Sequence, residues 1–398
     1  MKTSIYTATF ISLLLLVSCR PEEPMEQSID NSSITNVFDQ SGFKKLDVQG
    51  QGSDFEVIPI RNGGYLFIGK NTYNNIKALQ FDEDLNFVKR SSSSTNDYLN
   101  NPRVIENSSG DFLITSVSEL DDKNISSIKK LNGNLNLVWD NPINSEKSLS
   151  LTDLIETNEG TYIVAGKTSD KSNSFTSDFY IAKLNDLGEV KNETSIDLDF
   201  SDTPFFLKKL NEEKILFLGS TGGGPDEIFQ AILIDTSGNF DSNTEMTVKS
   251  SIVFQSSIET TEDNGFLLLT NNILENGAAK DVILVKLDKD YQYQWSKEFG
   301  GKNIEEVVKI LRSPNGGYFI ILNTRSYGSG GKDIYLAKIN TEGDILWSNT
   351  YGSISDEIAE NAFLINDRLV LYCTTKISTN SNQKDHNMLI LDLDGNPI

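Results

Sequence analysis

The sequence predicts an all-β fold, a seven-bladed β-propeller built from four-stranded antiparallel blades. Three observations carry this prediction. Short apolar runs typical of buried strands recur along nearly the whole chain with a period of roughly 50 residues. Each period holds the signals of four strands separated by turn residues. A period of this length with four strands in each unit is typical of a propeller rather than a solenoid.

The most regular unit lies between Gly316 and Gly352 and shows what a single blade contains. Tyr318–Leu322 is an apolar run of the kind that forms a strand buried on both faces. Asn340–Gly343 is a turn that places a glycine where the backbone is expected to take a positive φ. The equivalent central strands of the seven units are Tyr65–Gly69, Phe112–Thr115, Tyr162–Gly166, Ile215–Gly219, Phe266–Thr270, Tyr318–Leu322 and Leu369–Cys373.

Each central strand is preceded by a first strand and followed by a third. An Asp or Asn then opens a turn towards a fourth, outer strand. In four of the seven units a glycine follows three residues after that Asp or Asn, at Gly188, Gly238, Gly343 and Gly395. Trp139, Trp295 and Trp347 occupy one equivalent place on the outer strand.

The last unit lacks its outer strand, because the sequence stops at Ile398, shortly after Gly395. A spare strand-like segment, Phe43–Gln49, precedes the first unit. We therefore expect this N-terminal strand to complete the last blade and close the ring, which leaves no open edge between the first and last blades.

The N-terminus reads as a targeting segment. Lys2 supplies a positive charge, and Ala8–Val17 is an apolar stretch too short to span a bilayer. Leu16-Val17-Ser18-Cys19 resembles the lipobox of bacterial lipoproteins, which implies cleavage before Cys19 and its lipidation. An ordinary secretory signal with a chance cysteine is the alternative. The expected organisation is a signal peptide at 1–18, lipidated Cys19 with a flexible tether at 19–40, and the propeller at 41–398.

Further resemblances bear on location and fold. The acidic pair Glu22-Glu23, soon after Cys19, resembles the surface-export signal of Bacteroidetes lipoproteins. It implies the cell surface, with the periplasmic leaflet of the outer membrane as the alternative. The Gly343–Trp347 spacing after a strand ending in Lys-Ile-Asn resembles the repeat of quinoprotein-like propellers. The wider pattern of Gly316-Gly317-Tyr318, a Gly/Ser loop and the strand Asp333–Ile339 resembles repeat propellers of secreted bacterial proteins. These two resemblances indicate the fold but do not indicate a particular activity.

The chain carries 35 Lys and Arg against 57 Asp and Glu, a formal charge of −22. A field of this sign repels phosphate backbones, so we expect no nucleic-acid partner. With Cys19 lipidated, Cys373 is the one remaining cysteine, and its apolar surroundings predict a buried small hydrophobe.

Candidate binding residues lie on the face that carries the loops between second and third strands. These loops are longer and more varied than the other turns, and variable loops on a rigid scaffold are where binding usually occurs. The candidates are Tyr73, Phe175 and Tyr327 as exposed aromatic side chains, with Arg325 and Lys332 in the loop Arg325–Lys332. The alternative is that these loops are merely long and solvated.

Catalytic chemistry finds little support in the sequence. His386 is the only histidine, lies in a polar stretch predicted as a loop (Asn380–Asn387), and has no nucleophile motif nearby. Acidic turns such as Asp392–Asn396 suit hairpins better than calcium loops. Glu305-Glu306 and Asp356-Glu357 lead into first strands, where they form either an acidic channel mouth or strand caps.

The sequence therefore predicts a lipid-anchored, non-catalytic binding or scaffold propeller at the bacterial outer membrane or cell surface. We expect a protein partner in the cell envelope, with a glycan as a further ligand class, and no metal or cofactor. The alternative is a polysaccharide-binding or polysaccharide-degrading propeller, in which acids from different blades converge.

Overall fold

The computed structural model describes residues 34–39, 42–46, 48, 55–70, 76–93, 102–120, 123–170, 173–198, 201–222, 228–246, 256–273, 280–376 and 384–398. The predicted signal peptide, Cys19 and residues 20–33 of the predicted tether lie outside this part of the chain. Everything below refers to the described residues.

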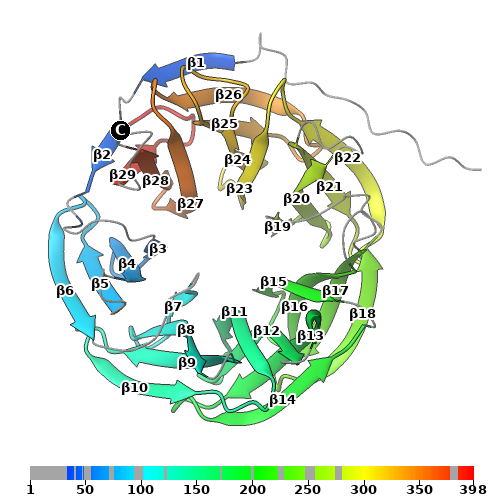
Figure 1. Ribbon diagram of the computed structural model, residues 1–398. Helices are drawn as coiled ribbons and strands as arrows, with labels where there is room; N and C mark the ends of the chain where they lie inside the picture. Colours follow the sequence, from blue (N-terminus) through cyan, green and yellow to red (C-terminus); the bar gives the residue numbers. More distant parts are fainter. Residues whose placement is uncertain are drawn as a thin grey trace, which may run out of the picture.

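Seven blades of antiparallel strands surround a central axis, as the sequence predicts (Figure 1). In each blade the chain starts at the axis and steps outwards strand by strand. From the axis outwards the blades are β3 (Phe55–Pro59), β4 (Tyr65–Lys70), β5 (Ile76–Phe81) and β6 (Phe87–Ser93); β7 (Val104–Glu106), β8 (Phe112–Leu120), β9 (Lys123–Leu131) and β10 (Leu137–Pro142); β11 (Ser148–Glu156), β12 (Tyr162–Asp170), β13 (Asn173–Leu184) and β14 (Val190–Ile196); β15 (Asp202–Lys209), β16 (Lys214–Thr221), β17 (Ile228–Asp235) and β18 (Phe240–Met246); β19 (Ser256–Thr260), β20 (Phe266–Ile273), β21 (Lys280–Leu287) and β22 (Tyr293–Phe299); β23 (Glu305–Arg312), β24 (Tyr318–Thr324), β25 (Asp333–Ile339) and β26 (Ile345–Gly352); and β27 (Glu357–Ile365), β28 (Arg368–Lys376), β29 (Lys384–Leu391) and β2 (Phe43–Lys45). We number these blades 1 to 7.

The apolar core lies between the blades rather than within them. Successive side chains of a strand point to opposite faces of its sheet, so a central strand serves two neighbours. In β24, Tyr318 and Ile320 pack with residues of blade 5, while Phe319 and Ile321 pack with residues of blade 7. Seven such clusters occur among the described residues, one at each junction.

The ring is closed by the N-terminal strand, as predicted. β2 pairs antiparallel with β29, and the backbone N–H of Leu46 donates to the carbonyl of His386 at 2.8 Å. Leu46 and Val48 then enter the cluster between blades 7 and 1. The C-terminus lies beside β2 in Figure 1, so an N-terminal strand and the C-terminal end of the chain meet in blade 7. β2 itself is shorter than the predicted strand Phe43–Gln49 and ends at Lys45.

One strand was not predicted. β1 (Ile34–Asp39) falls within the segment predicted as a flexible tether, and it forms a fifth strand on the outer edge of blade 6. It pairs in parallel with β26, from Ile34 opposite Ser348 to Asp39 opposite Gly352. Two of the first three residues of β1, Ile34–Asn36, are polar, which concealed its strand character, but the open edge of β26 offers backbone partners regardless of side chain.

The turns that follow the third strand are built in the same way in all seven blades. The side-chain Oδ1 of the leading Asp or Asn accepts the backbone N–H four residues later, in every blade. The residue three positions after it has a positive φ of 63–82°. Glycine meets this requirement in the four units where the sequence shows it, but Leu85, Leu135 and Tyr291 adopt the same left-handed conformation in the other three.

The tryptophans explain where glycine is required. Each of the three Trp rings reaches across to the turn of the next blade, so that a Cβ at Gly188, Gly343 or Gly395 would lie within 2.5–2.7 Å of Trp139, Trp295 or Trp347 respectively. A real Cβ does not approach a ring so closely. These glycines therefore satisfy two demands at once, a left-handed backbone and a flat surface for the neighbouring indole.

We expect Gly343→Ala to destabilise the propeller more than Gly160→Ala. Both positions have positive φ, for which alanine costs about 1–2 kcal/mol. Only Gly343 faces an indole, and overpacking there adds about 1–3 kcal/mol. Urea unfolding of the two variants measures the difference in their stability losses. When both variants also carry Trp295→Leu, most of this difference should disappear. Equal losses in the two variants would show that the Trp295 contact is unimportant.

Candidate functional site

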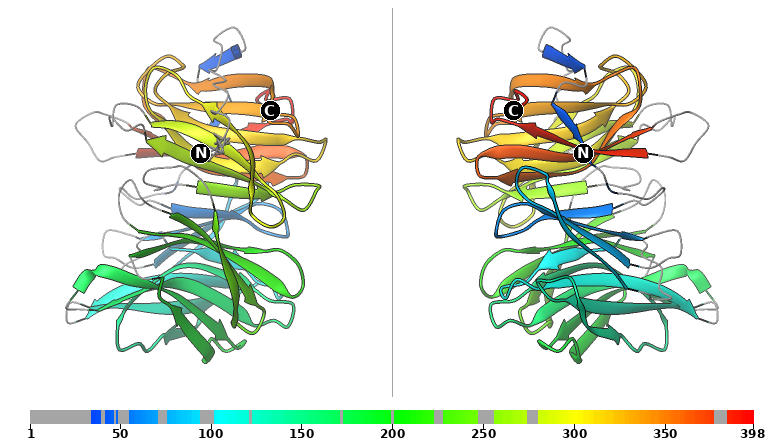
Figure 2. Two further views of the ribbon diagram at one scale, coloured as in Figure 1. Left: turned by 90° about the vertical axis from the view of Figure 1, so that its right-hand side faces the viewer. Right: turned by 90° about the vertical axis from the view of Figure 1, so that its left-hand side faces the viewer.

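The two faces of the ring differ, and Figure 2 shows them edge-on. We call the face that carries the turns between first and second and between third and fourth strands the tight-turn face. The opposite face carries the connections between second and third strands and between blades, and we call it the variable-loop face. Among the described residues, most of the tight turns repeat one geometry, with backbone hydrogen bonds such as Gly343 N–H to Asn340 O and Gly316 N–H to Ser313 O, while the turns after β15 and β27 differ.

Two of the predicted variable loops are largely extended hairpins. Val117–Asn124 was predicted as a loop, yet β8 and β9 continue to pair as far as Leu120 and Lys123. Lys167–Ser177 was predicted as a loop, yet β12 and β13 pair out to Asp170 and Asn173. The apolar pattern stops before these segments, but Ser and Thr suit a strand and the backbone ladder needs no apolar side chain.

The structure describes the side chains of only three of the five predicted binding-face residues. Tyr73 lies outside the described residues. Phe175 lies in β13, but its side chain is outside the described part of the structure. Arg325, Tyr327 and Lys332 lie in the loop between β24 and β25. None of the three side chains lines the cavity described below.

Tyr327 packs inwards rather than standing free. Its hydroxyl donates to the carbonyl of Gly300 at 2.8 Å, and its ring lies 5.8 Å from that of Tyr335. Burial raises the pKa of the Tyr327 hydroxyl to about 12. This side chain therefore joins the loop to the connection between blades 5 and 6, which is a structural contact.

Lys332 and Arg325 differ in how firmly they are held. The Lys332 ammonium contacts both oxygens of Glu306, at 2.8 and 2.7 Å, and its backbone N–H donates to Asp356 Oδ1 at 2.9 Å. The Arg325 backbone N–H donates to the carbonyl of Ile304, and its side chain is exposed. Arg325 is thus the more available of the two for a partner.

The expected acidic mouth is only partly present. Glu305 and Glu357 begin their strands as buried caps. Glu357 accepts the N–H and the hydroxyl of Ser353, both at 2.8 Å, and Glu305 accepts the Thr324 hydroxyl at 3.0 Å. Of the four acids, it is Glu306 that lines the channel mouth. The strand-cap interpretation therefore describes Glu305 and Glu357 better.

Buried carboxylates repeat at the junctions between blades. Asp333 is 1% exposed, at the start of β25, with one oxygen accepting the N–H of Gly330 at 3.3 Å. Burial raises the pKa of Asp333 to about 6, and the nearby Glu357 adds to the shift. Burial likewise raises the pKa of Asp202 to about 6, with a smaller contribution from Asp178. Burial also raises the pKa values of Asp281 and Glu305 at the junction of blades 5 and 6.

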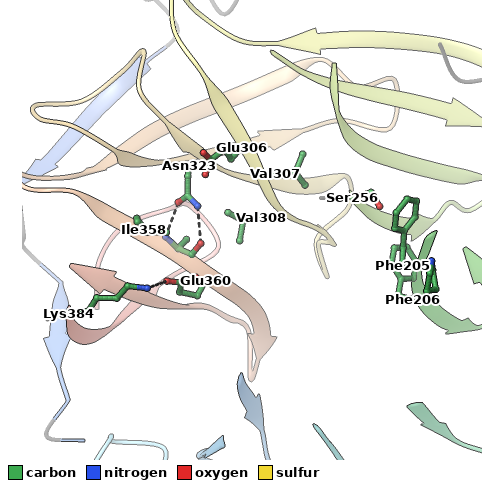
Figure 3. Close-up of a pocket in the computed structure, with 12 residues that line it drawn as sticks. Phe205, Phe206, Ser256, Glu306, Val307, Val308, Asn323, Ile358, Glu360 and Lys384 are labelled. Carbon is green, nitrogen blue, oxygen red and sulfur yellow. Dashed lines mark hydrogen bonds and ion pairs between the residues drawn. The ribbon is translucent and has the colours of Figure 1, made fainter. Parts of the chain in front are cut away.

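A cavity of about 510 Å³ opens at the channel mouth on the variable-loop face (Figure 3). It is lined by the inner ends of blades 4 to 7. Phe205 and Phe206 stand on one side, and Asn323, Glu360 and Lys384 stand on the other. Asn323 ties blade 6 to blade 7 here, because its side chain donates to Ala359 O at 3.0 Å and accepts from Ala359 N at 2.8 Å.

Four inner strands each contain a β-bulge, which adds one residue to the strand without a partner in the ladder. The pairing register shifts at Thr152 in β11, Phe205 in β15, Val308 in β23 and Glu360 in β27. Three of these four bulged residues, Phe205, Val308 and Glu360, line the cavity. Bulges re-aim side chains in this way at many binding sites. Sequence reasoning missed these residues, although two adjacent phenylalanines within one strand were a usable signal.

Charged side chains on or next to the inner strands join neighbouring blades around the channel. Arg103 Nε donates to Asp153 Oδ1 at 2.7 Å, and its Nη1 lies 3.5 Å from Glu56 Oε1. Lys309 Nζ donates to the Asn361 side chain at 3.1 Å. Burial lowers the pKa of Lys309 to about 8, and the nearby Arg103 contributes to the shift. These contacts link neighbouring blades around the axis, blades 1, 2 and 3 in one group and blades 6 and 7 in the other.

His386 does not lie in a loop, as the sequence suggested, but within β29, where it is buried. Its Nδ1 lies 2.7 Å from the Tyr372 hydroxyl, and the two rings stack. Cys373 is buried, as its apolar neighbours suggest, and burial raises its pKa. Both residues belong to the core near the closure of the ring.

Within the described residues, no group of three or more His, Cys, Asp or Glu side chains has a geometry that could hold a metal ion. No helix in this part of the chain is long and apolar enough to cross a membrane.

Comparisons with known proteins find similarity in fold but not in sequence. No family model matches the chain, and no curated protein matches it in sequence. An ulvan lyase, a polysaccharide lyase solved with bound -[GlcA(1-4)Rha3S]-, is similar in structure with a TM-score of 0.60 and 9% identity, over 89% of this chain and 100% of the lyase. BBS1N, solved in complex with ARL6DN, has a TM-score of 0.54 and 9% identity over 90% of this chain and 99% of its own. At such identities the similarity shows the propeller fold alone.

We expect the propeller to lose stability as the pH rises from about 4 to about 6. The folded state holds the protons of Asp202 and Asp333 up to a pKa of about 6, whereas the ordinary value is 3.8. Their contribution is full below pH 4 and is lost as the pH rises through 6, by at most about 3 kcal/mol for each group. Urea unfolding at a series of pH values measures this slope.

Asp333→Asn should remove the contribution of Asp333 to this pH dependence. The free energy of unfolding of the variant should therefore change less steeply between pH 4 and pH 6. Asp241→Asn, which neutralises an exposed aspartate on the outer strand of blade 4, should leave the slope unchanged. A slope that persists undiminished in Asp333→Asn would contradict the assignment.

Proposed function

We propose that this chain is a non-catalytic binding or scaffold propeller, anchored by lipid on Cys19 at the bacterial outer membrane and facing the cell surface. Its variable-loop face holds a protein partner of the cell envelope. The observation that carries the proposal is the difference between the two faces. One repeats the same hydrogen-bonded turn seven times, whereas the other has connections of unequal length around a cavity. A partner can recognise the second face uniquely.

The direction of β1 supports the orientation of this face. β26 runs from the tight-turn face at Ile345 to the variable-loop face at Gly352. Because β1 is parallel to it, the chain enters blade 6 from the tight-turn side at Ile34. An anchor at Cys19 would therefore precede the propeller on that side, and the variable-loop face would point away from the membrane.

Capture of partners from solubilised envelopes tests the choice of face. Replacing residues 325–332 by a short Gly/Ser turn should abolish capture of the partner that the unmodified chain retains. The control exchanges the turn Asn158-Glu159-Gly160 on the tight-turn face for another Gly-containing turn, which should leave capture unchanged. Mass spectrometry identifies the captured proteins. Loss in the control variant alone would assign binding to the opposite face.

Lipidation is tested separately. In a bacterial host that processes lipoproteins, the full chain should incorporate labelled palmitate and sediment with membranes, because several acyl chains hold a protein stably on a bilayer. Cys19→Ala should lose the label and appear in soluble fractions, whereas Cys373→Ala should keep both properties. Label that persists in Cys19→Ala would refute the anchor.

A further inference from the structure

We propose that the cavity at the channel mouth binds an uncharged saccharide, one or two sugar rings in size. This inference deepens the proposed function by adding a second ligand class, and rests on it only for the use of the variable-loop face. The cavity volume of about 510 Å³ falls in the range of about 300–1,000 Å³ typical of small-ligand sites. It opens between four blades, whose rigid inner strands fix its walls.

One wall of the cavity matches the apolar face of a sugar ring. Phe205 and Phe206 are half-buried and pack against the core between blades 4 and 5, and the Phe205 ring lies 5.9 Å from that of Phe229. Val308 adds an apolar surface on blade 6, near Asn323 and Ile358. Because a bulge sets Phe205 into the mouth, Phe205 and Phe206 offer a pre-formed platform for the C–H groups of a pyranose.

The opposite wall matches sugar hydroxyls. Glu306 is paired with Lys332, and Glu360 lies 3.6 Å from Lys384 while accepting the Thr374 hydroxyl at 2.8 Å. Each pair presents a carboxylate acceptor beside an ammonium donor. A sugar hydroxyl both donates and accepts, so two such pairs suit vicinal hydroxyl groups. Ser256 also lines the cavity, and its hydroxyl oxygen is buried with no hydrogen-bond partner among the described residues.

Charge decides between classes of sugar. The two lysines already balance Glu306 and Glu360, so a cationic ligand would have to displace an existing ion pair. The overall charge of −22 opposes uronate or sulfated sugars. An uncharged saccharide avoids both penalties, which is why we assign the cavity to this class.

The test is calorimetric titration of the full chain carrying Cys19→Ala with cellobiose, mannobiose, xylobiose and lactose, and with a glucuronate-containing disaccharide for comparison. We expect at least one neutral disaccharide to bind and the acidic one to bind at least about tenfold more weakly, a difference of about 1.4 kcal/mol. Phe205→Ala should weaken binding about tenfold or more, by loss of an aromatic contact worth about 1.4 kcal/mol.

Two further variants separate binding from folding. Phe240→Ala removes a 42% exposed phenylalanine from the outer strand of the same blade and should bind like the parent. Glu360→Gln alters an exposed side chain at the mouth and should weaken binding while leaving thermal unfolding unchanged. Absence of binding by all four neutral disaccharides, or equal affinities in Phe205→Ala and Phe240→Ala, would overturn the inference. Partner capture is read in a separate experiment, so either proposal can fail without the other.

Discussion

No blade of this propeller can bury its apolar surface alone, because both of its faces are apolar. The alternating side chains of β24 divide between two junctions, and every other central strand does the same. The stability of each blade therefore depends on two neighbours, and the ring has to close for blades 1 and 7 to gain theirs. β2 achieves this closure, and Leu46 and Val48 complete the last cluster. Folding of the chain is thus coupled from one terminus to the other.

This closed scaffold leaves the channel free to carry polar and irregular features. The blades are held together at their flanks, so the inner strands tolerate bulges and a belt of charges around the axis. Side chains such as Asn323 and Asn271 connect the end of a second strand to the first strand of the next blade. The positions of Phe205 and Glu360 at the cavity are consequently fixed by backbone pairing rather than by long flexible loops.

Much of this architecture could be predicted from the sequence because it depends on local, repeated signals. Apolar runs such as Tyr318–Leu322 and the turn glycines recur in register, and the surplus strand at Phe43 has one incomplete blade to join. Other features escape these signals. Leu85 and Tyr291 adopt a left-handed backbone because the Asx turn demands it, and no glycine marks them. His386 lies in β29 because the strand pairs with β28 beyond the apolar run, with His386 opposite Thr374. The cavity wall was missed because a bulge becomes visible only when the partner strand is known.

The inner-strand bulges have a consequence for how such a protein can change. In β11, Leu151 pairs with Gly166 and Asp153 pairs with Ala165, so the residue between them is accommodated without disturbing the ladder on either side. One residue inserted at the bulge position of an inner strand adds a side chain near the channel. The residues on either side of it keep their partners in the ladder and still face the same neighbouring blades. Blades 3, 4, 6 and 7 hold such an insertion, and in the described parts of β3 and β19 the register is unbroken. The lining of the channel can therefore diversify during evolution one blade at a time, independently of the core.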